Sequence, residues 1–228
     1  MKQAIIFDMY ETLISLWNFK SYMGREMSAD IGIPESTFRE IWDSTEDERT
    51  LGHVSFEEVV ARILRVNNRY SDELYQELVR KRIASKEEAF EHMHPNIIPM
   101  LQGLRDKNVK IGLVTNCFNE EREAIRNSIL FPYFDAVCMS CELEMKKPDQ
   151  RIFDLCIERL GISAEDCLYC GDGGSRELEV ARRMNMLPVQ ALWYLKENAG
   201  QPVGRLGEFI GVQNPMEILS YFLPERSL

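Results

Sequence analysis

The sequence predicts an α/β protein, with a doubly wound parallel sheet as its core and an all-helical segment inserted after the first strand. Three short apolar runs carry this prediction, because each has the length of a strand and ends on a compact polar cluster. These runs are Ala4–Phe7 before Asp8, Lys110–Val114 before Thr115 and Asn116, and Cys167–Cys170 before Gly171 and Asp172. Helical patterns alternate with strands in the second half of the chain, as is typical of parallel sheets.

The inserted segment shows helical patterns and no convincing strand. The expected helices are Trp17–Ile31, a second one with Pro34 in its first turn that is broken by Gly52, a third behind the capping box Ser55–Glu58, and a fourth from Ser71 towards Phe90. We therefore expect residues 1–15 and 93–228 to form the α/β core and residues 16–92 to form a separate helical unit.

The core is expected to continue as an alternation of helices and strands. The expected helices are Ile97–Lys107, one capped by Asn119 through Ile129, one from Pro148 to Gly161, Ser175–Met184 and Pro215–Phe222. The expected strands are Lys110–Val114, Asp135–Ser140, Cys167–Cys170 and Val189–Trp193. The tail Pro224–Leu228 is expected to fray. Right-handed crossovers place the carboxyl ends of parallel strands on one edge of the sheet, where ligands bind. Asp8, Thr115 and Asp172 are therefore expected to share a crevice.

The bulk composition limits the class of partner. The formal net charge is -10, which argues against nucleic acid or an anionic membrane as the main partner. Asp8 interrupts the first apolar run too early for a signal peptide, and no run is long enough to cross a bilayer. We expect a cytoplasmic protein; its oligomeric state cannot be read from the sequence.

Two C-x-x-C pairs, Cys138/Cys141 and Cys167/Cys170, suggest a zinc site on paper. Both pairs fall in expected strands, where residues three apart point to opposite faces, so neither pair should converge on one metal. Buried, reduced cysteines are the favoured interpretation.

The polar residues at the strand ends suggest phosphoryl-transfer chemistry. Two neighbouring carboxylates, Asp8 and Asp172, repel each other unless a cation lies between them, and oxygen ligands suit Mg²⁺. Glu177 could hold a metal-bound water. Thr115 and Asn116 offer uncharged hydrogen-bond donors, and Lys147 supplies a cation. This set suits attack of a carboxylate on a phosphoryl group, followed by hydrolysis of the acyl phosphate.

Taken together, these residues resemble the haloacid dehalogenase (HAD) superfamily of hydrolases. Its four motifs match, in order, Asp8-Met9-Tyr10-Glu11-Thr12, the strand ending in Thr115, Lys147-Pro148-Asp149, and Gly171-Asp172 with Glu177. The resemblance implies a helical cap over residues 16–92, a small phosphorylated metabolite as substrate and Mg²⁺ as cofactor. It assigns Asp8 as nucleophile, Asp172 and the Tyr10 carbonyl as metal ligands, and Thr115 and Lys147 as holders of the transferring group, with Thr12 and Asn116 beside the substrate.

One departure from the motifs leaves three functions open. The family's phosphatases carry a second aspartate two residues after the nucleophile, as general acid and base, and here that residue is Tyr10. Tyrosine at this position is found in the family's 2-haloacid dehalogenases, which use no metal, but those lack the acidic pair Asp172/Glu177. A Mg²⁺-dependent phosphatase is favoured, with a dehalogenase and a catalytically impaired binding protein as alternatives. Glu11, where glycine is usual, is a weak candidate for the missing acid.

Several residues have structural as well as functional interpretations. Arg49 lies where the family's cap often presents its specificity loop, so it is a candidate contact for a substrate anion, although an ordinary solvated arginine is favoured. Trp17 follows the first motif and could face the crevice. His92 and His94 lack a third ligand at suitable spacing, so a hinge between insert and core is favoured over a metal site.

Overall fold

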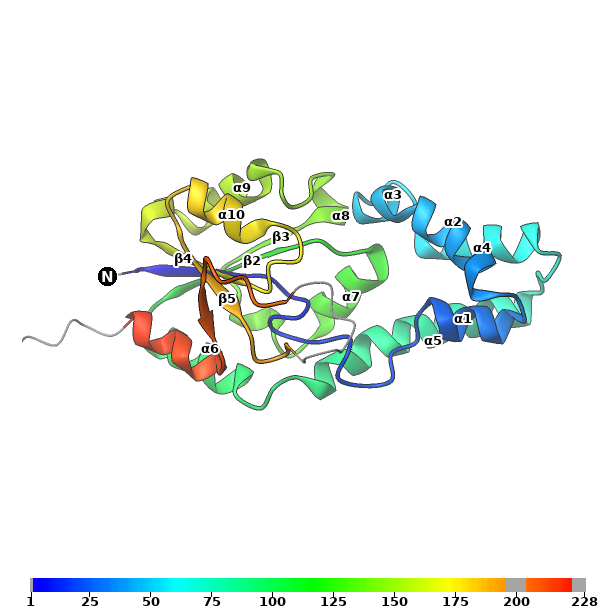
Figure 1. Ribbon diagram of the computed structural model, residues 1–228, viewed down its shortest axis with the longest axis horizontal. Coiled ribbons are helices and arrows are strands. Elements are labelled where there is room, and N and C mark those ends of the chain that lie inside the picture. The colour runs from blue at the N-terminus through cyan, green and yellow to red at the C-terminus, as the bar shows by residue number, and fades with distance from the viewer. Residues whose placement is uncertain (1, 196–203, 223–228) are drawn as a thin grey trace, which may run out of the picture.

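The computed structural model describes residues 2–195 and 204–222, and its centre is a six-stranded, all-parallel sheet (Figure 1). The strand order is β3-β2-β1-β4-β5-β6. The strands are β1 (Ala4–Phe7), β2 (Lys110–Thr115), β3 (Ala136–Met139), β4 (Cys167–Gly171), β5 (Leu187–Ala191) and β6 (Ile210–Val212). In register, Phe7 lies between Leu113 and Cys170, so the residues that follow β1, β2 and β4 emerge side by side. The predicted fold class is confirmed.

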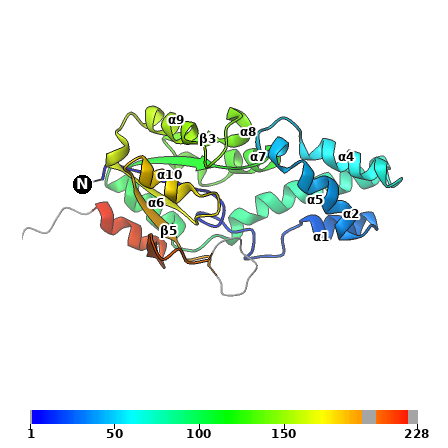
Figure 2. The same cartoon turned by 45° about the horizontal axis from the view of Figure 1, so that its top comes forward.

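Helices cover both faces of the sheet, which explains why its strands are apolar on both sides (Figure 2). One face packs against α6 (Ile97–Asp106), α7 (Asn119–Asn127) and the 3₁₀ helix η4 (Pro215–Phe222). The other face packs against α9 (Gln150–Leu160) and α10 (Glu177–Arg183). In β1, Ile5 and Phe7 belong to the first core and Ala4 and Ile6 to the second, as the two-residue period of a strand requires.

The segment after β1 forms a helical unit with its own core. It consists of α1 (Gly24–Ile31), α2 (Glu35–Ser44), α3 (Glu46–Thr50), α4 (Phe56–Val66) and α5 (Asp72–Glu88), and it extends away from the sheet in Figure 1. Met27, Phe38, Phe56, Ile63 and Leu78 are buried together between these helices. The apolar residues of the insert are therefore largely satisfied within it, and we refer to α1–α5 as the helical insert.

The first predicted helix is wrong in its first half. Residues 17–23 form no helix, and α1 begins only at Gly24. Side chains bind the backbone of this stretch instead: Ser21 Oγ donates to the carbonyl of Leu16, and Tyr22 N donates to Ser85 Oγ 2.8 Å away on α5. Such bonds satisfy the backbone outside a helix and compete with helix formation.

Other boundaries also differ from the prediction. The second helix ends at Ser44, well before Gly52, which instead follows the short α3 in the left-handed conformation (φ 77°). Asn119 is the first residue of α7 and not its cap, and that helix ends at Asn127. Pro34 precedes α2 as its N-terminal cap residue.

Four elements near the sheet were missed or changed. Ser140 begins a short helix, α8 (Ser140–Leu143), so Cys141 lies on a helix and not in a strand. The edge strand β6 has only three residues, too few for a periodic pattern. The strand expected at Val189–Trp193 begins earlier and ends at Ala191, and the last helix, Pro215–Phe222, is a 3₁₀ helix. Pro224–Leu228 lies outside the described residues.

All six cysteines are free and buried, in agreement with the interpretation as reduced core residues. No described helix is both long and apolar enough to cross a membrane. His92 stacks on Phe19 with ring centroids 5.0 Å apart, and Nδ1 of His94 accepts a hydrogen bond from Asn96 N. Within the described residues, neither histidine belongs to a group of metal-ligating side chains.

Candidate active site

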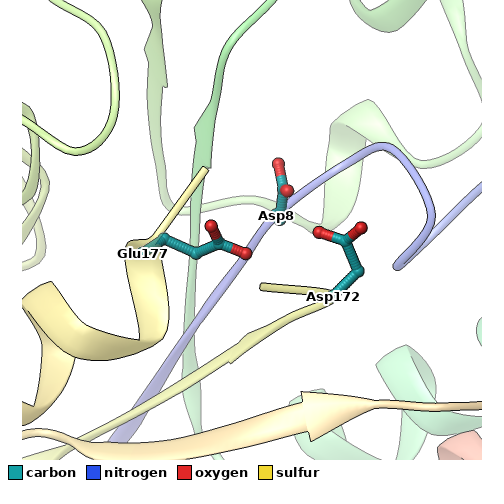
Figure 3. A group of neighbouring side chains, drawn as sticks. All are labelled: Asp8, Asp172 and Glu177. Carbon is teal, nitrogen blue, oxygen red and sulfur yellow. The ribbon is translucent and has the colours of Figure 1, made fainter. Parts of the chain in front are cut away.

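Three carboxylates from separate parts of the sequence converge at the carboxyl edge of the sheet (Figure 3). Asp8 directly follows β1, Asp172 directly follows β4, and Glu177 is the first residue of α10. Their nearest oxygens all lie within 4.8 Å of one another. Within the described residues, no other group of three or more histidine, cysteine or acidic side chains lies close enough together to hold a metal ion.

Lys147 supplies the positive charge nearest to this cluster. Its Nζ lies 2.7 Å from Oδ1 of Asp8, and both side chains are buried. Burial alone would lower the pKa of Lys147, but the negative charges of Asp8 and Glu177 raise it above its ordinary value. When all four groups are ionised, three negative charges face one positive charge, so two further positive charges would neutralise the site.

Burial is the main perturbation of both aspartates. It raises the pKa of Asp8, although Lys147 opposes the rise. The pKa of Asp172 rises from 3.8 to about 7, because burial and the charges of Glu177 and Asp8 all disfavour its ionised form. A divalent cation between these carboxylates would reverse the effect, because it favours the charged forms. The donor set of hard oxygens therefore fits Mg²⁺.

The loop after β4 is organised by Glu177. Its two carboxylate oxygens accept hydrogen bonds from Gly173 N (2.7 Å) and Ser175 N (2.8 Å). A Cβ at Gly171 would lie 2.8 Å from Oε1 of Glu177, so a larger residue there would have to displace this carboxylate from its hydrogen bonds. Glu177 thus holds the loop that presents Asp172.

Asn116 positions Lys147. Its Oδ1 accepts from Lys147 N at 2.8 Å, and its Nδ2 donates to Lys147 O at 3.1 Å. This pair of bonds fastens the lysine's backbone to the end of β2, so the amide's hydrogen-bonding groups are already engaged. Thr115 is fully buried at the end of the same strand. Among the described residues, its hydroxyl makes only a long contact, 3.4 Å, with the carbonyl of Asn116.

Tyr10 points towards the helical insert and α7. Nζ of Lys86, on α5, lies 5.8 Å from its ring centre. Burial, followed by the negative charges of Glu121 and Glu120, raises the pKa of the phenol well above its ordinary value. The hydroxyl is therefore protonated at neutral pH and can donate a proton or a hydrogen bond, but cannot serve as a base.

Glu11 does not take the place of the missing acid. Its carboxylate accepts from Ser15 Oγ (2.7 Å) and from Leu16 N (2.8 Å), which ties it to the loop after β1. Its φ of 54° lies in the left-handed region that favours glycine, so the backbone here matches the glycine usual at this position in the family.

The remaining candidates of the first motif region lie in different environments. Thr12 is fully buried, and its Oγ1 has no hydrogen-bond partner among the described residues. Trp17 is 44% exposed and lines a cavity between the helical insert and α7. Arg49 lines the same cavity but is only 1% exposed, so the favoured interpretation as a solvated arginine is wrong.

The structure also adds residues that the sequence analysis did not assign to the site. Gln190, on β5, donates from Nε2 to the carbonyl of Asp172 at 2.9 Å. Trp193 donates from Nε1 to the carbonyl of Thr12 at 2.8 Å. Both bonds join the chain after β4 to the loops that carry the carboxylates. No sequence pattern could have identified Gln190 or Trp193 as site residues, because each of them donates to a main-chain carbonyl, and every residue has one.

The comparison that decides the family is a match between residues 2–185 and the model for haloacid dehalogenase-like hydrolases. The chain belongs to this family. The matched range contains β1 to β4 with all four motifs.

Individual relatives cover less of the chain. It is 32% identical over 99 residues to a glyceraldehyde 3-phosphate phosphatase from Methanopyrus kandleri, a match to 42% of each chain. It is 29% identical over 132 residues to a phosphoglycolate phosphatase from Aquifex aeolicus, a match to 57% of this chain and 62% of the relative. The chain thus spans about two fifths to three fifths of the length of these two relatives.

Solved structures of this family share the whole fold. A HAD phosphatase from Thermococcus onnurineus matches with a TM-score of 0.63 at 23% identity over 100% of both chains. A 2-haloacid dehalogenase from Pseudomonas syringae matches with a TM-score of 0.67 at 18% identity, over 98% of this chain and 100% of that one. The fold is therefore common to phosphatases and dehalogenases and does not by itself separate them.

Proposed function

We propose that the protein is a Mg²⁺-dependent phosphatase of a small phosphorylated metabolite, which reacts through an aspartyl phosphate on Asp8. The observation that carries this proposal is the charge imbalance of the site. Asp8, Asp172 and Glu177 lie within 4.8 Å of one another with Lys147 as their cation. A buried site of this kind suits a divalent metal and the phosphate group that would share it.

Each site residue has a role in this proposal. Asp8 attacks phosphorus, so that an Asp8–phosphorus bond forms as the bond to the leaving oxygen breaks. Lys147 and Thr115 hold the oxygens of the transferring group, with Thr12 beside them, and Asn116 acts through Lys147 by fixing its backbone. Mg²⁺ would be held by Asp8, Asp172, the Tyr10 carbonyl and, through a water molecule, Glu177. In that place it would neutralise charge on the phosphate.

The leaving group needs a proton, which an aspartate supplies in the family's other phosphatases. Here the protonated hydroxyl of Tyr10 or a water molecule is the donor. General acid catalysis contributes about 10²- to 10⁴-fold, so a weaker donor makes the enzyme slow without abolishing turnover. Because the pKa of Tyr10 is raised, the phenolate needed to activate water for the second step is scarce at neutral pH.

The residues 16–92 are proposed to act as a cap over the site. The contacts between insert and core support this: Asp47 pairs with Lys146, and His53 Nε2 lies 3.6 Å from Glu144. A Cβ at Gly52 would lie 2.1 Å from the carbonyl of Cys141, so the insert approaches the core closely there. Movement at these contacts would admit substrate and then exclude water.

A 2-haloacid dehalogenase is the second candidate, favoured by Tyr10. The acidic cluster weighs against it, because a reaction without metal would leave two buried carboxylates and one partly buried carboxylate with only Lys147 to balance them. The phosphatase names of the sequence relatives also favour the first candidate.

The test is hydrolysis of an aryl phosphate with and without Mg²⁺. We expect turnover only with the metal, its loss in Asp8→Asn, and its retention in Asp154→Asn, which removes an exposed carboxylate on α9. No turnover on any phosphate ester, together with metal-independent release of halide from 2-chloropropionate, would establish the dehalogenase instead. Silence in both assays, with a ligand still raising the melting temperature, would indicate a binding protein.

A further inference from the structure

Two cysteines from separate parts of the sequence lie in contact beside the candidate active site. Cys117 follows β2, two residues after Thr115, and Cys141 is the second residue of α8. Their sulfur atoms are 3.7 Å apart. The backbone holds them in place, because Cys117 N donates to Ser140 Oγ at 3.0 Å and this hydroxyl donates in turn to the carbonyl of Cys117 at 3.2 Å. A disulfide requires two cysteines whose side chains face each other, as these do.

The two thiols differ in reactivity. A hydrogen bond from Cys117, together with the charge of Arg122, lowers the pKa of Cys141. The same hydrogen bond and burial raise the pKa of Cys117 well above its ordinary value. Cys141 is also the more accessible of the two, with 8% exposure against 1%. Because the thiolate is the form that attacks an oxidant, Cys141 is the reactive member and Cys117 is its partner.

Both cysteines lie where the helical insert meets the core. α8 packs against α3 of the insert (Figure 1), and a Cβ at Gly52 would lie 2.1 Å from the carbonyl of Cys141. Phe118 directly follows Cys117, and its ring centre lies 4.3 Å from the guanidinium carbon of Arg49 on the insert. A bond that draws the two sulfurs together therefore moves two segments of the core that the insert contacts.

Such a bond also acts on Lys147. Asn116 directly precedes Cys117 and makes two hydrogen bonds to the backbone of Lys147, at 2.8 and 3.1 Å. Lys147 Nζ in turn lies 2.7 Å from Oδ1 of Asp8. Misplacement of a catalytic group by about 1 Å can lower a rate by about 100-fold. Oxidation of the cysteines is therefore expected to disturb the site as well as the contact with the insert.

We propose that Cys117 and Cys141 form a site of reversible oxidation, at which a hydroperoxide converts the two thiols into a disulfide and so lowers the activity of the neighbouring site. The thiolate of Cys141 attacks a peroxide oxygen, the O–O bond breaks, and a sulfenic acid forms as an alcohol or water leaves. The thiol of Cys117 then attacks the sulfenic sulfur, so that the S–S bond forms as the S–O bond breaks, and the hydroxyl leaves as water with the proton of the thiol. The pair loses two electrons, which a small dithiol returns. The effect on activity rests on the proposed function, whereas formation of the disulfide does not.

A second pair of cysteines serves as an internal control. Cys138 and Cys156 also interact, since a hydrogen bond from Cys156 lowers the pKa of Cys138. Both are fully buried in the core on the α9 side of the sheet, away from the insert. A peroxide can therefore reach Cys141 at the edge of the core more readily than it can reach Cys138. We expect selective oxidation at the first pair although both pairs are close together.

The experiment treats the purified protein with hydrogen peroxide, blocks the remaining thiols with N-ethylmaleimide and maps disulfides by mass spectrometry of a non-reducing digest. We expect a disulfide between Cys117 and Cys141, with Cys138 and Cys156 recovered as blocked thiols. For hydrolysis of the aryl phosphate, kcat/KM should fall by about 10- to 100-fold and recover after treatment with dithiothreitol.

Single variants separate the roles of the two thiols. Cys117→Ser should leave the sulfenic acid of Cys141 without a partner, so that dimedone labels it. Cys141→Ser should leave Cys117 unmodified and keep its activity in peroxide. Cys167→Ser is the matched control, since Cys167 is also buried but its Sγ bonds the carbonyl of Ser163 at 3.4 Å, and this variant should respond to peroxide as the wild type does. Circular dichroism and melting temperature establish that each variant is folded before oxidation.

Disulfide mapping does not depend on catalysis, so the inference and the proposed function can fail separately. Reduced Cys117 and Cys141 after peroxide, or a disulfide between Cys138 and Cys156 in their place, would overturn the inference. A disulfide between Cys117 and Cys141 that leaves kcat/KM unchanged would overturn its effect on the site. Absence of phosphate-ester hydrolysis before oxidation, with the disulfide still formed by peroxide, would overturn the proposed function and leave the oxidation site.

Discussion

Replacing Asp172 by asparagine should stabilise the metal-free protein, although the residue lies in the candidate active site. Asparagine is nearly isosteric with aspartate, and its Oδ1 can still accept the hydrogen bond that Gly174 N now donates to Asp172 Oδ1 at 2.9 Å. What the substitution removes is one of three mutually repelling carboxylates within 4.8 Å of one another. The local geometry is therefore kept while the electrostatic cost falls.

The size of the effect follows from the pKa of Asp172. Its rise from 3.8 to about 7 corresponds to about 4 kcal/mol when the group is fully ionised. Because the side chain is partly accessible to water, we expect about half of this, ~2 kcal/mol. For a protein of this length, that gain raises the melting temperature by about 4–8 °C.

The sign depends on pH in a defined way. A carboxyl group whose pKa is raised by folding favours the folded state below its unfolded pKa, and this contribution is lost as the pH rises through its folded pKa. The advantage of Asp172→Asn should thus be complete at pH 8, shrink as the pH falls from about 7 to 4, and vanish below 3.8.

The assay is thermal unfolding in chelator-treated buffer at pH 8, 6 and 4, with Asp154→Asn as the control for loss of an exposed charge. Added Mg²⁺ should stabilise the wild type but not Asp172→Asn, because only a protein that binds the ion in its native state gains stability. A lower melting temperature for Asp172→Asn at pH 8 without metal, or a gain that persists at pH 4, would refute the reasoning.

Three further predictions concern the same region. Mg²⁺ must displace the proton of Asp172, so its affinity, measured by calorimetry, should fall about 10-fold from pH 8 to pH 6; a pH-independent affinity would show that Asp172 is not a ligand. Tyr10→Asp places a carboxyl group beside Glu121, whose charge favours its protonated form, and should raise kcat on an alkyl phosphate by at least about 10-fold; unchanged or lower turnover would contradict the account of the missing acid. Lys86→Met leaves Glu121 buried without its 2.6 Å partner and should lower the free energy of unfolding by about 3–5 kcal/mol in denaturant titrations. The double variant that also carries Glu121→Gln should recover part of this loss. A loss below about 1 kcal/mol would show that the pair is not structurally important.

The fold and the catalytic cluster could be predicted because each depends on local pattern combined with a general rule. A run such as Ala4–Phe7 reads as a strand buried on both faces, and parallel strands bring their carboxyl ends to one edge. The sequence therefore predicted that Asp8 and Asp172 share a site, and their carboxylates lie within 4.8 Å of each other.

Helix boundaries in the insert were less predictable, because long-range contacts decide them. Trp17 to Met23 has a composition compatible with a helix, but Ser85, on α5, takes the backbone N–H of Tyr22. No periodicity in the segment itself reveals a partner more than sixty residues away. Such contacts override local preference where propensities are weak.

By itself the sequence determined the parallel sheet, its family and the residues gathered at its edge, since alternation of strand and helix and the order of the motifs are local properties of the chain. Only the tertiary structure decided what surrounds those residues. It buried Arg49 between Trp42 and Phe118, paired Lys86 with Glu121 beside Tyr10, and engaged Asn116 with Lys147. Burial and pairing depend on which surfaces meet when the insert packs on the core, and that meeting sets the charge of the cavity as well as its shape.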